Sequence, residues 1–328
     1  MHEALLQRRK STERYVDKPT QALLGVARRR LELIPEMINT GGIYLPSDPV
    51  HARIMRYFAD WHINGMQVTG EEYLREAVEI SEYSGMLITS NHQTDLDHAA
   101  RSKVVGGLGH STFSDRFVFP SGLKMMERPY IRPLMGAENA VFIATPQDIE
   151  VVQKTLTRDK VENILTEDQK QSLKDYLATL KELNEKAGGK LEDLKKEGFI
   201  PFLYPEAGRT RHPKGRIQKP REETALYTYQ REGSNGKPGE LYIFPFSVDG
   251  LEKVLPPNKG WRFWRRTNVQ VAFGQPYPAS EIWDKQRVKS LREMGASKAD
   301  YMMAKIYQTN RALADPADAS FYEAVLTA

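Results

Sequence analysis

From residue 85 onward, short apolar runs alternate with longer charged segments. Short runs rich in β-branched and aromatic side chains are typical of buried strands, and the segments between them are long enough for helices. This alternation predicts an α/β fold in which a mixed, mostly parallel sheet is flanked by helices on both faces. The predicted strands are residues 85–89, 116–119, 140–144, 200–204, 241–246 and 268–273.

The N-terminal part of the chain has a different pattern. Residues 22–37 and 50–63 carry apolar positions at spacings of three and four, and residues 71–83 predict a third helix. Because 328 residues exceed one ordinary core, we predict two domains. They are an N-terminal helical domain, residues 1–78, and an α/β domain, residues 79–328.

Two charged segments are predicted to lie outside the core. Residues 151–196 have a helical pattern that Gly188 and Gly189 are expected to break, which predicts a helical hairpin packed outside the sheet, with a mobile lid as the alternative. Three consecutive arginines, Arg28 to Arg30, predict a solvated face.

Composition excludes several classes of protein. Lys and Arg number 47 against 43 Asp and Glu, so the net charge is only +4, and 40% of the residues are hydrophobic, as in ordinary globular proteins. The absence of cysteine excludes disulfides, thiolate catalysis and zinc–thiolate sites. No apolar run approaches the roughly 20 residues that span a bilayer, and the N-terminus lacks the apolar core of a secretory signal. We therefore expect a protein that is soluble or peripheral to a membrane.

The run that begins at Met86 ends abruptly in polar side chains. Thr94 and the acids after it predict the first turn of a helix, which places His92 on the preceding turn. Positions five apart on one helix point to different faces, so His92 can meet Asp97 only if it precedes the helix. An imidazole with an ordinary pKa near about 6.5 can take a proton from a hydroxyl, and a carboxylate partner fixes its tautomer. His92 and Asp97 are therefore candidate catalytic residues.

Structural alternatives exist for the same residues. Asp97 stands three residues after Thr94, as in a capping box, and His92 would then be an ordinary loop histidine. Asp95, Asp97 and His98 also raise the question of a metal site, but acids at a helix start more often serve the helix dipole. We expect no metal and no cofactor.

A second polar turn follows the predicted strand at residues 200–204. It carries Glu206, Gly208, Arg209 and Arg211. Because guanidinium groups bind phosphate through paired hydrogen bonds, two arginines two residues apart suit a phosphorylated ligand. A solvated basic loop is the alternative. Nucleic acid is not expected, since this turn has no interleaved aromatic residues.

The order of these two motifs resembles the glycerophospholipid acyltransferase family. The shared features are Asn-His, four residues and Asp at positions 91–97, followed by a strand that ends in Pro-Glu-Ala-Gly-Arg. The overall plan is most similar to the soluble glycerol-3-phosphate acyltransferases. The resemblance implies that His92 is the general base, that Asp97 orients it, and that Glu206, Gly208, Arg209 and Arg211 bind substrate. It also implies acyl-CoA or acyl carrier protein as donor and glycerol 3-phosphate as acceptor.

One departure from the family pattern concerns the acceptor. Thr145, Pro146 and Gln147 stand where family members usually carry a cation, and Lys124 and Arg128 are candidates to replace it. A lysophospholipid or another alcohol is therefore an alternative acceptor. Two further hypotheses are a hydrolase and a non-catalytic protein that binds lipid or a carrier.

Residues 261–266, WRFWRR, interleave aromatic and basic side chains. Such a segment suits a peripheral membrane contact, an acyl-CoA phosphate or an acidic acyl carrier protein. The cytoplasm of a bacterium or a plastid stroma would suit a soluble enzyme of this kind.

Overall fold

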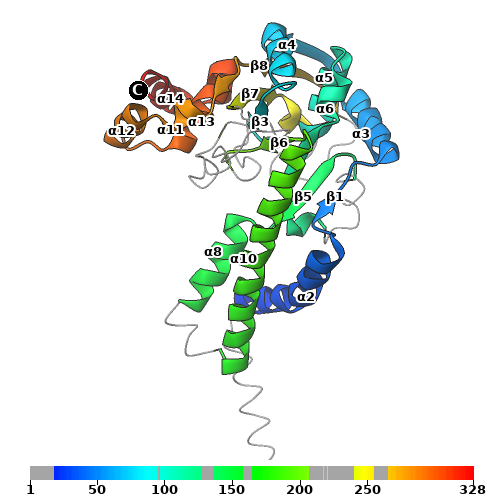
Figure 1. The fold of residues 1–328 in the computed structure, drawn as a ribbon, viewed down its shortest axis with the longest axis vertical. Helices are drawn as coiled ribbons and strands as arrows, with labels where there is room; N and C mark the ends of the chain where they lie inside the picture. Colours follow the sequence, from blue (N-terminus) through cyan, green and yellow to red (C-terminus); the bar gives the residue numbers. More distant parts are fainter. Residues whose placement is uncertain are drawn as a thin grey trace, which may run out of the picture. The chain divides into compact units, whose positions relative to one another are not determined.

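The computed structural model describes residues 18–94, 97–126, 136–157, 165–206, 217, 220, 240–254 and 265–328 (Figure 1). Within them the strands form one nine-stranded sheet, ordered β1-β5-β4-β6-β3-β7-β8-β2, with β9 paired to β7. The strands are β1 Tyr44–Leu45, β2 Ile63–Thr69, β3 Gly85–Ser90, β4 Phe117–Gly122, β5 Asn139–Ile143, β6 Ile200–Leu203, β7 Leu241–Asp249, β8 Thr267–Phe273 and β9 Tyr277–Pro278.

The described helices account for most of the rest of the fold. They are α2 Lys18–Thr40, α3 Pro49–His62, α4 Glu71–Ile80, α5 Asp97–Gly107, α6 Ser111–Ser114, α8 Pro146–Leu156, α10 Glu167–Lys196, α11 Ser280–Trp283, α12 Lys285–Glu293, α13 Lys298–Thr309 and α14 Pro316–Thr327. Short 3₁₀ turns lie at η1 Leu123–Met125, η4 Leu251–Lys253 and η5 Arg311–Leu313.

The predicted fold class is confirmed. Strand β3 pairs in parallel with β6 on one side and with β7 on the other, and β4 pairs in parallel with β6. The sheet is mixed because β7 runs antiparallel to both β8 and β9, while β2 pairs in parallel with β8. All six predicted strands are present.

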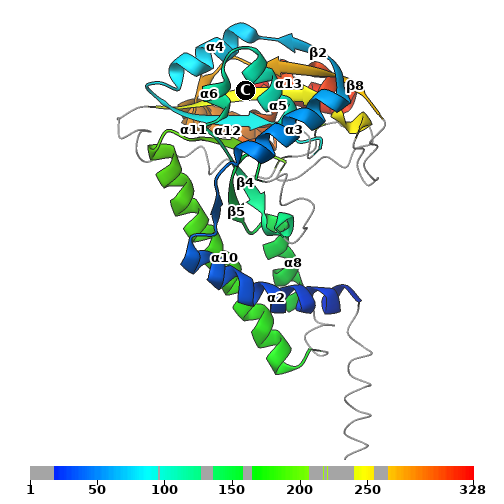
Figure 2. The same ribbon diagram turned by 90° about the vertical axis from the view of Figure 1, so that its right-hand side faces the viewer.

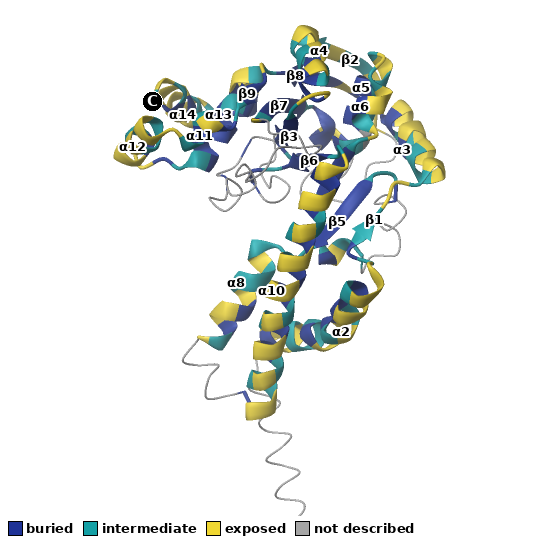
Figure 3. Ribbon diagram, in the orientation of Figure 1, coloured by how far each residue is buried: buried dark blue, intermediate teal, exposed yellow. Residues whose placement is uncertain are grey.

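Strand β3 explains why these runs are apolar throughout. Its side chains alternate between two cores: Met86 and Ile88 pack with residues of α3 to α6, and Leu87 packs with residues of α11 to α14. A strand covered by helices on both faces has no solvent side, so its sequence does not alternate. Every residue of β3 is buried, as the dark strands of Figure 3 illustrate.

The chain divides into two compact units. Unit 1 contains residues 1–45, 121–128 and 141–190, and unit 2 contains residues 46–120, 129–140 and 191–328. This division does not coincide with the predicted boundary at residue 78. Residues 46–78 belong to unit 2 because β2, which they contain, pairs with β8 near the other end of the sequence.

Strand β2 lies between the predicted helices at residues 50–63 and 71–83, where the sequence pattern predicted no strand. Its sequence, INGMQVT, contains a glycine, and after the buried Ile63 its residues are exposed or partly buried. At the end of the strand order it pairs with β8, so β2 is less apolar than the central strands. Weak apolar periodicity of this kind is typical of an edge strand.

Two further predictions in unit 1 need correction. Helix α10 runs without interruption through Gly188 and Gly189, so these glycines do not break it (Figure 2). Of the three consecutive arginines, Arg30 is buried, and its Nη1 atom donates to the Tyr176 hydroxyl at 2.8 Å and to Asp148 Oδ1 at 3.3 Å.

Among the described helices, none combines the length and the apolar character that crossing a bilayer requires.

Candidate active site

The two polar turns singled out in the sequence meet at neighbouring strand ends. Strands β3 and β6 pair in parallel, with Ile88 opposite Phe202 and Thr89 opposite Leu203, so their carboxyl ends lie at the same edge. Just beyond them, the backbone N–H of His92 donates to Glu206 Oε2 at 3.0 Å. Glu206 is 8% exposed, so this hydrogen bond ties the histidine turn to the second motif within the protein interior.

The side chain of Asn91 holds the same turn from the other neighbouring strand. Its Nδ2 donates to the Val248 carbonyl at 2.7 Å, and its Oδ1 accepts from the Val248 N–H at 3.0 Å. The amide side chain thus forms the same pair of hydrogen bonds that the backbone of a neighbouring strand would form. The turn that carries His92 is therefore fixed to both β6 and β7.

Asp97 has the surroundings of a helix-capping carboxylate. The backbone N–H of Gln93 donates to its Oδ2 at 2.6 Å, the backbone N–H of Thr94 lies 3.1 Å from both oxygens, and the Thr94 hydroxyl donates to Oδ1 at 3.1 Å. These bonds orient the first turn of α5, as the capping interpretation expects. They also keep the fully buried carboxylate hydrogen-bonded.

The same carboxylate contacts the imidazole of His92. His92 Nδ1 lies 3.1 Å from Asp97 Oδ2. Burial alone would raise the pKa of Asp97, but the hydrogen bond from His92 and the charge of Arg101 outweigh it, so the pKa lies below its usual value. An ionised carboxylate accepts hydrogen bonds and donates none, so Nδ1 carries the proton and Nε2 is the basic nitrogen of the neutral ring.

The His92 ring is packed against an aromatic side chain. Tyr204 stacks on it with a centroid distance of 4.0 Å and an interplanar angle of 21°. The His92 side chain retains 13% exposure, so the ring is largely covered but still partly exposed. A partly exposed imidazole oriented by a carboxylate has the properties that general-base catalysis requires.

Arg101, which the sequence reasoning missed, is fully buried behind this pair. Its guanidinium lies over the rings of Phe202, Tyr204 and Phe246 at 4.4, 4.9 and 5.5 Å. Its Nη2 donates to Ser90 Oγ at 3.0 Å and to the Asn91 carbonyl at 2.9 Å, and it lies 3.8 Å from Asp97 Oδ2. The signal in the sequence was its position four residues after Asp97, a spacing that brings opposite charges together on a helix.

Tyr204 connects Arg101 to a second histidine. Its hydroxyl accepts from Arg101 Nη1 and lies 3.1 Å from His98 Nε2, while His98 Nδ1 lies 2.7 Å from Glu138 Oε2. Burial raises the pKa of Tyr204 well above its usual value, so the phenol stays protonated. Glu138, His98, Tyr204 and Arg101 therefore form a continuous polar network beside His92.

Most of the remaining predicted site residues lie in parts of the chain that the structure does not describe. Gly208, Arg209 and Arg211 lie outside the described residues, as do Arg128 and Trp261. Thr145, which stands where a cation was expected, caps α8: its hydroxyl accepts from the Asp148 N–H and its own N–H donates to Asp148. Within the described ranges, no group of three or more histidine, aspartate or glutamate side chains is arranged to hold a metal ion.

Comparison with known proteins finds similarity among solved structures. No protein-family model matches the chain, and no curated protein does. A solved structure, the 1-acyl-sn-glycerophosphate (LPA) acyltransferase PlsC from Thermotoga maritima, is similar to it with a TM-score of 0.38. Identity is 14%, and the match covers 84% of this chain and 95% of that chain. A likeness at this level does not bear on activity or substrate.

Proposed function

We propose that this protein is an acyltransferase that moves a fatty acyl group from a thioester to the hydroxyl of a phosphorylated alcohol, with glycerol 3-phosphate as the acceptor. The observation that carries the proposal is the contact of His92 Nδ1 with the buried Asp97 Oδ2 at 3.1 Å. A neutral imidazole oriented by an ionised carboxylate is suited to general-base catalysis. The proposal involves no metal or cofactor.

In the proposed reaction, His92 Nε2 removes the proton from the acceptor hydroxyl as its oxygen attacks the thioester carbonyl carbon. The tetrahedral intermediate collapses when the carbon–sulfur bond breaks, and the thiolate leaves with the proton that the imidazolium returns. Asp97 stabilises the imidazolium between these steps. The products are an oxygen ester and a free thiol, so every atom and proton is accounted for.

Arg209 and Arg211 are proposed to hold the acceptor phosphate. In the sequence they follow Glu206 by three and five residues, and the Glu206 carboxylate accepts the backbone N–H of His92 at 3.0 Å. In the sequence, both arginines are therefore within five residues of a side chain that contacts the proposed general base. Forked guanidinium groups suit a phosphate dianion better than they suit a neutral headgroup.

A lysophospholipid is the alternative acceptor, and helix α3 is the observation that favours it. Val50, Ile54, Tyr57 and Trp61 form a line of apolar side chains that we name the α3 stripe. Their exposed fractions are 64, 45, 68 and 46%. The spacing of four, three and four places them on one helix face, whereas Met55 and Ala59 face the core. An acceptor that resides in a membrane would reach the enzyme at such a surface.

We propose that the α3 stripe contacts an anionic membrane surface. Arg53 and Arg56 are exposed on the same helix, and the Arg266 guanidinium lies 5.1 Å from the centroid of the Trp61 ring. An apolar face bordered by arginines is typical of helices that lie in the interface of anionic lipids.

An acceptor screen tests the proposed reaction. Palmitoyl thioesters of coenzyme A and of acyl carrier protein are incubated with glycerol 3-phosphate, glycerol and lysophospholipids, and products are identified by mass spectrometry. We expect an acylated glycerol 3-phosphate and little acylated glycerol. Arg209→Ala and Arg211→Ala should each raise the acceptor KM about tenfold or more and leave the donor KM nearly unchanged. Release of free palmitate alone would instead identify a hydrolase.

Vesicle flotation tests the membrane contact. Replacement of Tyr57 and Trp61 together by serine should weaken binding to phosphatidylglycerol vesicles by at least about tenfold, because two apolar side chains no longer enter the interface. Tyr83→Ser is the matched control, since Tyr83 is 57% exposed and lies outside the stripe. Equal binding of the double variant and the control would exclude the α3 stripe as the contact.

A further inference from the structure

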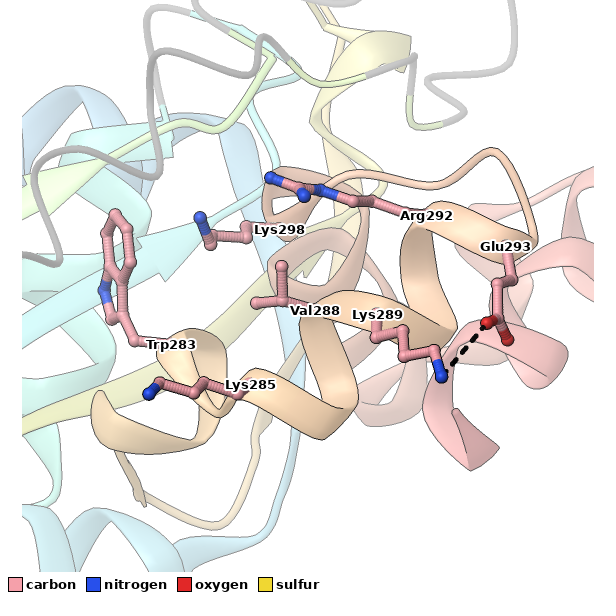
Figure 4. Close-up of a pocket in the computed structure, with 7 residues that line it drawn as sticks. All are labelled: Trp283, Lys285, Val288, Lys289, Arg292, Glu293 and Lys298. Carbon is pink, nitrogen blue, oxygen red and sulfur yellow. Dashed lines mark ion pairs between the residues drawn. The ribbon is translucent and has the colours of Figure 1, made fainter.

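A second basic site lies on the helices near the C-terminal end, apart from the residues discussed so far. A cavity of about 390 Å³ opens between α11, α12 and α13. We name it the α12 hollow. Its walls are the indole of Trp283, the side chain of Val288 and the cations of Lys285, Lys289, Arg292 and Lys298 (Figure 4).

The spacing along α12 explains why three of the cations share one helix face. Lys285, Lys289 and Arg292 are spaced by four and three residues, so they lie on one face of the helix, with Val288 between them. Lys298 reaches the same space from the first residue of α13. Its ammonium lies 4.0 Å from the centroid of the Trp283 ring, which holds the charge beside the cavity.

The charge of the α12 hollow is largely unbalanced. Among the lining residues that the structure describes, Glu293 is the one acid, and its contact with Lys289 Nζ is long, at 3.9 Å, between side chains that are 66 and 79% exposed. An exposed ion pair of this kind adds little stability, so it neutralises the lysine only weakly. Arg287, by contrast, does not line the cavity and pairs with Glu281 at 3.1 Å. The basic residues of α12 are thus divided between a structural ion pair and an open cationic cavity.

We propose that the α12 hollow binds a phosphorylated nucleotide, a ligand that combines an aromatic base with two or more phosphate charges. The cations of α12 supply phosphate ligands, and the Trp283 and Val288 walls supply apolar surface for the base. The cavity volume lies within the range of roughly 300–1,000 Å³ that is usual for small-ligand sites. A free nucleotide and the nucleotide portion of coenzyme A share this chemistry.

Binding measured without turnover tests this inference separately from the proposed reaction. Isothermal titration of the full-length protein is carried out with ATP, coenzyme A, pyrophosphate and adenosine. We expect ATP or coenzyme A to bind at least about tenfold more tightly than pyrophosphate or adenosine, and more weakly at higher salt. A preference for coenzyme A over ATP that the charge-reversal variant described next abolishes would assign the α12 hollow to a thioester donor, and the reverse preference would assign it to a free nucleotide.

Charge-reversal variants locate the site. The double variant Lys285→Glu and Arg292→Glu should weaken nucleotide binding by at least about tenfold. The matched control is Arg75→Glu with Lys253→Glu, which makes the same change in net charge at exposed residues of α4 and η4. Equal binding of the two double variants, or binding of pyrophosphate as tight as that of ATP, would overturn the proposal. Melting temperatures close to that of the wild type verify that the variants are folded.

Discussion

Replacing His92 with alanine is expected to abolish acyl transfer while the protein remains folded. The imidazole is the proposed proton acceptor, and general-base catalysis typically contributes about 10²–10⁴-fold to a rate. The fold should survive because the turn is held by backbone and neighbouring groups: the His92 N–H bonds to Glu206, and Asn91 bonds to Val248. The rate of labelled acyl transfer to the acceptor, measured with saturating substrates, is the readout.

His110→Ala is the control for this variant. His110 precedes α6 in the same unit, and its side chain makes no capping hydrogen bond there. Its replacement should leave both kcat and the melting temperature near their wild-type values. If His92→Ala transferred acyl groups at the wild-type rate, the general-base assignment would be rejected. In that case, retained binding of the acyl donor would favour the non-catalytic alternative.

Replacing Arg101 with leucine is expected to destabilise the protein strongly. The guanidinium is fully buried, and its loss would leave the buried Asp97 carboxylate without its nearby cation. Removing one partner of a buried ion pair typically costs about 3–5 kcal/mol, whereas an exposed substitution such as Arg75→Leu changes stability by about 0.5 kcal/mol or less. Urea unfolding near neutral pH measures both variants.

The effect of Arg101→Leu should depend on pH in a defined direction. Because the pKa of Asp97 is depressed in the folded protein, its ionised form contributes stability above the ordinary carboxyl pKa, and this is lost as the pH falls through the folded-state value. The attraction between Asp97 and Arg101 disappears when the carboxylate is protonated. The stability difference between wild type and Arg101→Leu should therefore narrow on acidification.

A double-mutant cycle isolates the coupling between these two residues. Asp97→Asn keeps an acceptor for the Thr94 N–H but removes the charge. The double variant with Arg101→Leu should lose less free energy of unfolding than the two single variants lose in sum. We expect the difference to be at least about 0.5 kcal/mol. Strictly additive effects would show that Arg101 stabilises the site through its aromatic and carbonyl contacts instead.

The sequence alone was sufficient to predict the central strands of the sheet and the contact between His92 and Asp97. Strands such as β3 are buried on both faces, so their apolar runs stand out, and all six predicted strands were found. The spacing of His92, Thr94 and Asp97 is a local property of a turn and a helix start. Backbone geometry over six residues brings the two side chains together, and the distant Glu206 and Val248 then hold the turn in place.

Other features depended on the tertiary structure. Strand β2 carries little apolar signal of its own, and its identity comes from pairing with β8, some two hundred residues away. No sequence motif links the four residues of the polar network beside His92, and only the folded chain brings them together. They are Arg101, Tyr204, His98 and Glu138. Whether a cation is solvated or buried depends on which distant side chains surround it, and local sequence patterns do not contain that information.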